Sequence, residues 1–120
     1  HMMPYSLWTN KGFPLFTCSG WGLFSNKTGK WKKEPLIDSK FMNRIRGNAP
    51  NDIFVAGDYG FLAHWNGLTW KVYDEFSDNG GSIFRVAVKG NTIAAIGILR
   101  GSAVAIIGKR QFNTGPVVNE

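Results

Sequence analysis

Three arginines are the side chains with the clearest capacity for binding chemistry in this sequence. Arg44 and Arg85 lie 41 residues apart, and each stands directly before a β-branched residue. Arg46 follows two residues after Arg44, so the two side chains share one face of an extended strand. Guanidinium groups suit carboxylates and phosphates because they donate paired hydrogen bonds to them. We expect a basic site for an anionic ligand here, with ion pairs to Asp52 or Asp58, or simple solvation, as the alternative.

Two aromatic residues suit a different kind of ligand. Trp21 and Tyr59 lie 38 residues apart, and each is next to a glycine in what we interpret as turns on one rim. Exposed rings in repeated turns suit stacking on sugars or bases, although an aromatic beside glycine packs between neighbouring elements at least as often. Arg100 occupies the third equivalent position, so it is a candidate contact residue that breaks the aromatic pattern.

Residues for catalysis are few. His64 is the only histidine beyond the first position, and Cys18 is the only cysteine. A Ser-His-Asp arrangement would have to use His64, which we expect to be structural, whereas the apolar run around Cys18 predicts a buried, inert thiol. Asp52 and Asp58 could form a carboxylate pair for glycoside hydrolysis, but both are better explained as turn residues. We predict no enzyme activity, no metal and no cofactor.

The elements that must position these residues are short strands. Residues 51–70 contain three apolar runs, separated by Gly57-Asp58-Tyr59-Gly60 and by Asn66-Gly67. Asn-Gly between such runs predicts a two-residue type I′ hairpin turn, because both residues tolerate a positive φ. Residues 53–56 are apolar at every position, which predicts a strand covered on both faces.

The same pattern recurs along the chain. Residues 13–24 match residues 51–62 at an offset of 38, and a weaker third copy follows at offsets of 40 and 41. We place units at about 5–39, 40–80 and 81–112, within a single domain of residues 3–112. His1-Met2 has the form of a cloning scar, and residues 113–120 form a polar tail.

A period near 40, with each unit composed of strands and tight turns, is typical of β-propeller blades. We therefore predict an all-β fold of about three propeller-like blades, each an antiparallel four-stranded meander, with at least ten strands in total. Trp31 and Trp70 close the first two units, and we expect both indoles to be buried between blades. An ordinary β-sandwich or barrel is the alternative, and residues 36–46 have a weak helical pattern.

The second unit carries a resemblance. Residues 45–60 and 64–70 are similar to the repeat of bacterial β-propeller proteins: Asn-Asp, an apolar strand, Gly-Asp-x-Gly, a second strand, an aromatic-Asn-Gly turn and Trp. The closing turn also resembles the Asp-box of sialidase-like propellers, although Asn66 replaces the Asp. This resemblance implies the fold; propellers include enzymes, lectins and scaffolds, so it does not select a function.

Composition narrows the function classes further. The 120 residues carry a formal net charge of +6, contain 15 glycines and include no apolar run long enough to span a membrane. A lone cysteine favours a reducing compartment, and we expect a cytoplasmic protein if the chain is complete. Nucleic acid is not favoured, because the basic residues are spread along the chain and cluster only at Lys30-Trp31-Lys32-Lys33.

A non-catalytic interaction module is the function that these features favour. We expect it to bind a protein or an anionic ligand through its rim loops or a basic channel. The alternative is a carbohydrate-binding propeller, either lectin-like or the remnant of a glycosidase. Three blades leave two apolar faces uncovered, at residues 93–99 and 103–107 among others, so we also expect a homodimer that closes a six-bladed ring.

Overall fold

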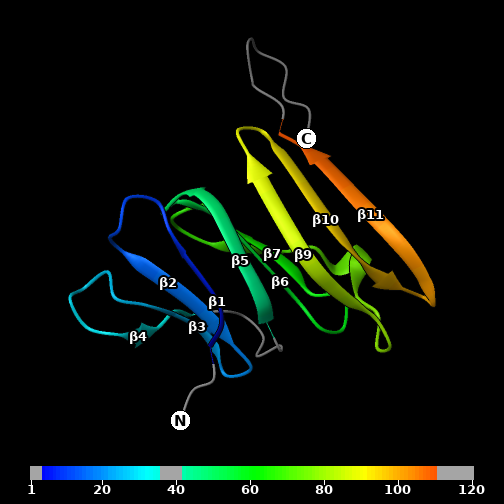
Figure 1. Cartoon of the computed structure of the whole chain (residues 1–120), viewed down its shortest axis with the longest axis horizontal. Coiled ribbons are helices and arrows are strands. Elements are labelled where there is room, and N and C mark those ends of the chain that lie inside the picture. The colour runs from blue at the N-terminus through cyan, green and yellow to red at the C-terminus, as the bar shows by residue number, and fades with distance from the viewer. Residues whose placement is uncertain (1–3, 36–41, 111–120) are drawn as a thin grey trace.

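The computed structural model describes residues 4–35 and 42–110, and within these ranges the protein is all-β. Eleven strands form three antiparallel sheets, which confirms the predicted all-β class and the minimum of ten strands. The three sheets lie across the molecule in chain order, with the middle sheet packed between the other two (Figure 1). The polar tail at 113–120, the first two residues and the start of the weak helical pattern lie outside the described residues.

The three sheets follow one another along the chain. Sheet I consists of β1 (Pro4–Thr9), β2 (Leu15–Ser19), β3 (Gly22–Ser25) and β4 (Lys32–Lys33). Sheet II consists of β5 (Met42–Ala49), β6 (Asp52–Gly57), β7 (Leu62–Trp65) and β8 (Trp70–Val72). Sheet III consists of β9 (Ser82–Lys89), β10 (Thr92–Leu99) and β11 (Ser102–Lys109). A single 3₁₀ turn, η1 (Asp74–Phe76), connects sheets II and III.

Two details of this layout differ from the prediction. The third unit has three strands within the described residues, where four were expected. The helical alternative is wrong from Met42 onward, because Met42–Ala49 forms the strand β5. This strand pairs with β6 along its length, and these long-range pairings outweigh the weak period of 3.6.

The first strand of each sheet lies at the centre of the molecule. β5 contacts β1 on one side and β9 on the other, and all three run in the same direction (Figure 1). The β2–β3, β6–β7 and β10–β11 turns therefore lie at one end of the sheets, which we call the lower rim. The β1–β2, β5–β6 and β9–β10 turns lie at the other end, the upper rim.

Each sheet has two faces, which we call leading and trailing. The leading face carries Phe16 and Cys18 in sheet I, Phe54 and Ala56 in sheet II, and Ala94 and Ile96 in sheet III, because these residues occupy equivalent register positions. The opposite, trailing face carries the residues that alternate with them. The leading face of sheet I packs on the trailing face of sheet II, and the leading face of sheet II packs on the trailing face of sheet III.

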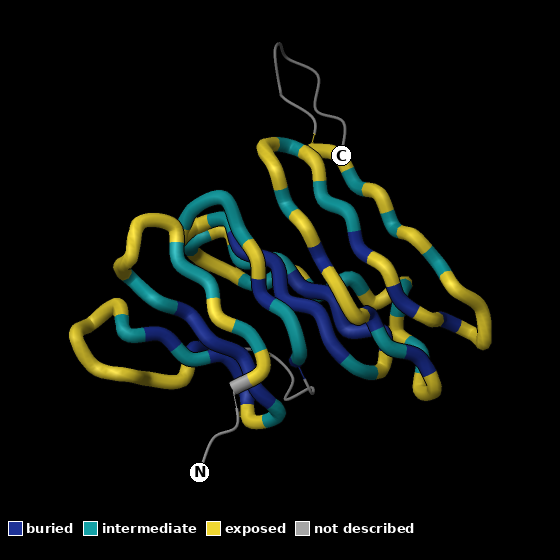
Figure 2. The backbone as a smooth tube through the Cα atoms, viewed as in Figure 1, coloured by how far each residue is buried: buried dark blue, intermediate teal, exposed yellow. Residues whose placement is uncertain are grey.

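Sheet II is covered on both faces. Ile53, Val55 and Ala63 belong to the apolar core shared with sheet I, whereas Phe54, Ala56 and Leu62 belong to the core shared with sheet III. The continuous burial of residues 53–56 confirms the prediction made from their unbroken apolar run. Figure 2 shows the consequence, with buried backbone concentrated in the middle of the molecule and exposed backbone along β11.

The two outer sheets each leave one face open, and within the described residues the three sheets do not close into a ring. On the leading face of sheet III, Ile96 is 51% exposed and Ile107 is 64% exposed. On the trailing face of sheet I, Leu7 is 58% exposed.

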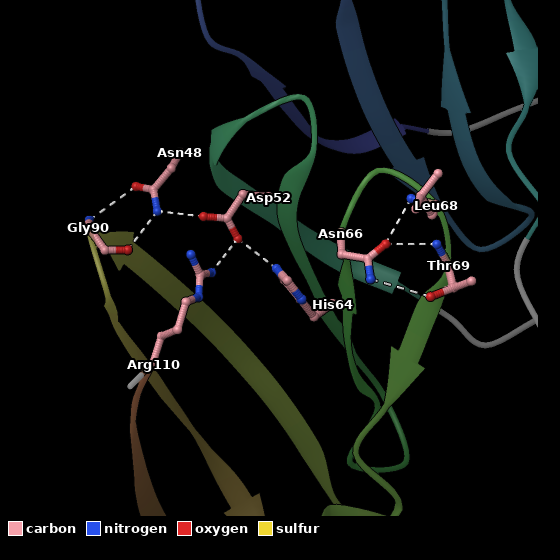
Figure 3. Close-up of polar contacts among 8 residues, drawn as sticks. All are labelled: Asn48, Asp52, His64, Asn66, Leu68, Thr69, Gly90 and Arg110. Carbon is pink, nitrogen blue, oxygen red and sulfur yellow. Dashed lines mark hydrogen bonds and ion pairs between the residues drawn. The ribbon is translucent and has the colours of Figure 1, made fainter. Parts of the chain in front are cut away.

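The Asn66-Gly67 turn is longer than predicted. Trp65 pairs with Trp70, so the connection contains four residues and not two. The side-chain oxygen of Asn66 accepts hydrogen bonds from the backbone N–H groups of Leu68 and Thr69, each at 2.8 Å (Figure 3). Asn66 thus caps the loop with its side chain, and only Gly67 adopts a positive φ.

Type I′ backbone geometry occurs in a different turn. Tyr59 and Gly60 have φ values of 63° and 69°, and Arg100 and Gly101 at the equivalent place in sheet III have φ values of 51° and 79°. Gly60 is also closely packed, because a Cβ there would lie 1.9 Å from the carbonyl oxygen of Phe76. The β6–β7 turn is therefore held against the connection to sheet III.

The prediction that both unit-closing tryptophans are buried is wrong for Trp31, which is 49% exposed. Trp70 is partly buried: it contacts Trp65 with ring centroids 5.4 Å apart and packs against the core between sheets I and II. Trp31 belongs by strand alternation to the trailing face of sheet I, which no sheet covers within the described residues. Its register position opposes Asn26, where sheet II has an aromatic ring.

Candidate functional site

The three candidate arginines lie on neighbouring inner strands. Arg44 pairs with Ala56 and Arg85 pairs with Ile96, so the two occupy equivalent positions on β5 and β9. Arg46 pairs with Phe54 and shares its face of β5 with Arg44. Arg44 is half-buried, whereas Arg46 and Arg85 are exposed.

All three guanidinium groups contact uncharged oxygens. Arg44 donates to the carbonyl of Asn43 at 2.8 Å, and Arg85 donates to the carbonyl of Phe84 at 3.0 Å. Arg46 donates to the carbonyl of Ile45 at 2.6 Å and to the hydroxyl of Ser6 on β1 at 3.1 Å.

The expected alternative, ion pairs with Asp52 or Asp58, is not found for these arginines. Asp52 pairs with Arg110, and Asp58 accepts a hydrogen bond from Ser82. Among residues 4–35 and 42–110, no carboxylate lies within ion-pair distance of Arg44, Arg46 or Arg85.

Arg44 borders a hollow of about 280 Å³ at the lower rim. The other lining residues are Tyr5, Met42, Asn43 and Asp58, so the hollow brings a cation, a carboxylate and a phenol together between β1, β5 and the β6–β7 turn. The side-chain oxygen of Asn43 is buried and has no hydrogen-bond partner. The sequence analysis did not identify Tyr5 or Asn43 as site residues. Asn43 directly precedes Arg44, which was the available signal for Asn43, whereas Tyr5 is on a different strand, β1.

The candidate aromatic residues lie in equivalent turns of the lower rim. Trp21, in the β2–β3 turn, is 64% exposed, and Tyr59, in the β6–β7 turn, is 42% exposed. The backbone of Tyr59 is fixed, since its N–H donates to Gly81 at 2.8 Å and its carbonyl accepts from Asp78 at 2.9 Å. A fixed backbone with an exposed ring suits stacking on a flat ligand.

Arg100, the third candidate in this series, is bound to the protein itself. Its backbone N–H donates to the carboxylate of Asp78 at 2.6 Å. Its guanidinium group lies 3.4 Å from the carbonyl oxygens of both Glu75 and Ser77. Arg100 therefore ties the β10–β11 turn to the connection between sheets II and III.

A polar network joins sheets II and III at the upper rim (Figure 3). Asp52 accepts hydrogen bonds from Arg110 at 2.7 Å and Asn48 at 2.8 Å, and shares a third with His64 at 2.6 Å. Asn48 also donates to the carbonyl of Gly90 at 2.7 Å and accepts from its N–H at 3.2 Å. The sequence did not reveal this network, because its members come from five separate segments.

The network determines the ionisation of Asp52. Burial alone raises the pKa of this carboxyl group, but hydrogen bonds from Arg110, Asn48 and His64 outweigh burial and hold the pKa below its ordinary value. His64 packs against Phe54 with ring centroids 4.3 Å apart. Among the described residues, His64 makes no hydrogen bond to a serine or cysteine, so this Asp-His pair has the contacts of a structural link.

Cys18 lies within the core between sheets I and II and is fully buried. Burial raises the pKa of its thiol to about 12, against the opposing effect of the Arg44 and Arg46 charges. The thiolate needed for nucleophilic attack is therefore scarce at neutral pH. The part of the chain described by the structure also contains no cluster of residues able to hold a metal ion.

Comparisons with known proteins do not assign this chain to a family. No protein-family model, curated protein or solved structure matches this chain significantly. Among residues 4–35 and 42–110, no helix has the length and apolar character needed to cross a membrane.

Proposed function

We propose that this chain is a non-catalytic binding module that takes an anionic ligand on its basic inner strands. The observation that carries the proposal is that Arg44, Arg46 and Arg85 lie on neighbouring strands with no carboxylate partner among the described residues. Guanidinium groups whose charge is not neutralised within the protein attract anions, and the net charge of +6 adds to this attraction.

The architecture supports a β-propeller-like arrangement with the three sheets as blades. The central first strands and the constant stacking of leading on trailing faces are what such blades require. In a propeller the innermost strands line a channel, and here those strands carry the arginines. The hollow beside Arg44, which Asp58 also lines, is the part of this basic surface where we expect the carboxylate or phosphate to bind.

Calorimetric titration with tripolyphosphate tests the proposal. Replacing Arg44 by Gln removes a charge-assisted contact, and we expect the Kd to rise on the order of 10-fold to 100-fold. Lys30→Gln is the matched control, because it removes the same charge from an exposed turn of sheet I. Equal weakening in both variants, or no binding by the wild type, would contradict an inner-strand site.

A lectin-like function is the second candidate, and the exposure of Trp21 and Tyr59 in equivalent turns is the observation that favours it. Exposed aromatic side chains offer a flat apolar face on which a sugar ring can stack. A glycan array with Trp21→Ala and Tyr59→Ala variants should then show lost signals. Leu68→Ala is the control, since Leu68 is exposed in a different turn.

A further inference from the structure

The leading face of sheet III is an open apolar surface. Three isoleucines and a phenylalanine on this face are exposed: Ile96, Ile98, Ile107 and Phe84. A shallow hollow of about 580 Å³ runs between β9, β10 and β11, lined by Phe84, Ile96, Ile98 and the small residues Ala103 and Ala105. Contiguous apolar surface of this kind marks an interaction site.

The chain itself shows what covers a leading face. In sheet I, Phe16 and Cys18 are covered by the trailing face of sheet II. In sheet II, Phe54 and Ala56 are covered by the trailing face of sheet III. Both internal junctions follow one rule, leading face on trailing face.

The trailing face of sheet I is the surface that this rule leaves unmatched, and it is open along its two edge strands, whereas Thr17 and Ser19 on the second strand, β2, are buried. It presents Leu7 on β1 and, by strand alternation, Trp31 next to β4, both about half exposed. The equivalent tryptophan of sheet II, Trp70, packs against the core formed with the preceding sheet. Trp31 therefore has the position of a junction residue without the sheet that would cover it.

We propose that the trailing face of sheet I in a second copy of this chain covers the leading face of sheet III, and that two copies close a ring of six sheets. The new junction packs a leading face on a trailing face, as the two internal junctions do. A pairing of two leading faces would not follow this pattern. Six sheets fall within the range of four to eight found in closed propellers. The contact is heterologous, so ring closure is what limits assembly to two copies.

This inference rests on the apolar faces and does not depend on the proposed anionic ligand. It adds one consequence for that ligand: a closed ring places the arginines of both copies around one axis. A dimer that binds no anion would contradict only the proposed function, and a monomer that binds anions would contradict only the proposed ring.

Sedimentation equilibrium over a wide concentration range gives the first test. The wild type should have twice the 13.3 kDa mass of one chain. A monomer at millimolar concentration would overturn the proposal, and polymers that grow with concentration would overturn ring closure.

Two charged variants give the second test. Ile96→Glu blocks the leading face of sheet III, and Leu7→Lys blocks the trailing face of sheet I. Each should raise the dimer Kd on the order of 100-fold, because a desolvated, unpaired charge opposes the contact. Both positions are exposed in one chain, so circular dichroism should show unchanged folding. Leu68→Glu, at an exposed leucine on neither face, should remain a dimer.

Mixing the two blocked variants identifies the geometry. One junction of the mixed pair joins an unaltered sheet III to an unaltered sheet I, so the mixture should recover the mass of two chains. If Leu7→Lys alone stays dimeric, or the mixture stays monomeric while both variants are folded, the head-to-tail arrangement is wrong.

Discussion

The junction between sheets I and II and the junction between sheets II and III bury equivalent residues but are held together differently. In the first junction, the hydroxyl of Ser6 on the inner strand β1 accepts hydrogen bonds from the N–H of Ile45 and from Arg46. In the second, hydrogen bonds lie at both rims. Asp52 binds Arg110 at the upper rim, and Asp58 binds Ser82 at the lower rim.

This difference separates what packing does from what polar contacts do. Both junctions exclude water with similar apolar residues, so both gain the non-directional stabilisation of buried apolar surface. The polar contacts at the rims of the second junction additionally fix the orientation of sheet III, whose other face is open. We expect the first junction to depend mainly on packing and the second on packing together with its rim contacts.

The largest expected loss of stability comes from truncating a buried phenylalanine at the equivalent position of each junction. Phe16→Ala and Phe54→Ala remove buried rings from the first and second junctions, and each should lower the free energy of unfolding by about 3–5 kcal/mol. Urea unfolding measures these losses. Labelling of the buried thiol of Cys18 under native conditions reports local opening of the first junction alone.

We expect Phe16→Ala to accelerate thiol labelling more than Phe54→Ala, once both rates are compared at equal global stability. Equal acceleration by the two variants would mean that the junctions open as one unit. The two junctions would then not differ in their local stability.

A smaller effect is expected at the lower rim. Gly60→Ala places a methyl group against the carbonyl of Phe76 in a turn that is already left-handed, and should lower stability by about 3 kcal/mol. Gly101→Ala is the matched control, with φ at 79° and no atom within 4 Å of the new Cβ. Its loss should be only about 1–2 kcal/mol of backbone strain. Similar losses in both variants would show that the β6–β7 turn is not packed against the connection between sheets II and III in solution.

The smallest expected effect is a pH-dependent one at the upper rim. The folded state lowers the pKa of Asp52, so its stabilising contribution is present above the unfolded pKa, near 3.9, and is lost as the pH falls through the folded value. Asp52→Asn should therefore lower stability by about 1–2 kcal/mol at pH 7. That deficit should shrink as the pH falls toward about 2.

Thermal unfolding from pH 2 to pH 7 measures this deficit. Glu75→Gln is the control for removing one acidic charge, since its side chain is exposed. A deficit for Asp52→Asn that stays constant across the whole pH range would exclude an ionised Asp52 as the source.

Local sequence pattern predicted several parts of this fold that depend on neighbouring residues, although the β7–β8 turn is longer than its local pattern predicted. The apolar run at residues 53–56 predicted a doubly covered strand, and the 41-residue spacing placed Arg44 and Arg85 in equivalent register positions. Contacts between distant segments could not be predicted in this way. Asp52 and Arg110 lie 58 residues apart, and only the stacking order of the sheets brings them together.

The exposure of Trp31 shows a second limit. Its sequence context matches that of Trp70, so pattern alone predicts the same burial for both. Burial also depends on whether a neighbouring sheet exists to cover the residue, and sheet I has none on its trailing face within the described residues. Tyr5 and Asn43 were missed for a related reason, since the hollow that they line forms only where β1 meets β5.

The backbone at Tyr59 and Arg100 has a consequence for how this sequence can change. Both residues hold a left-handed conformation that glycine adopts freely and that other residues adopt at a loss of about 1–2 kcal/mol. On backbone preference alone, glycine or asparagine would be favoured at both positions. A tyrosine and an arginine at these two turns therefore carry side chains to the lower rim at the expense of backbone strain that glycine would avoid.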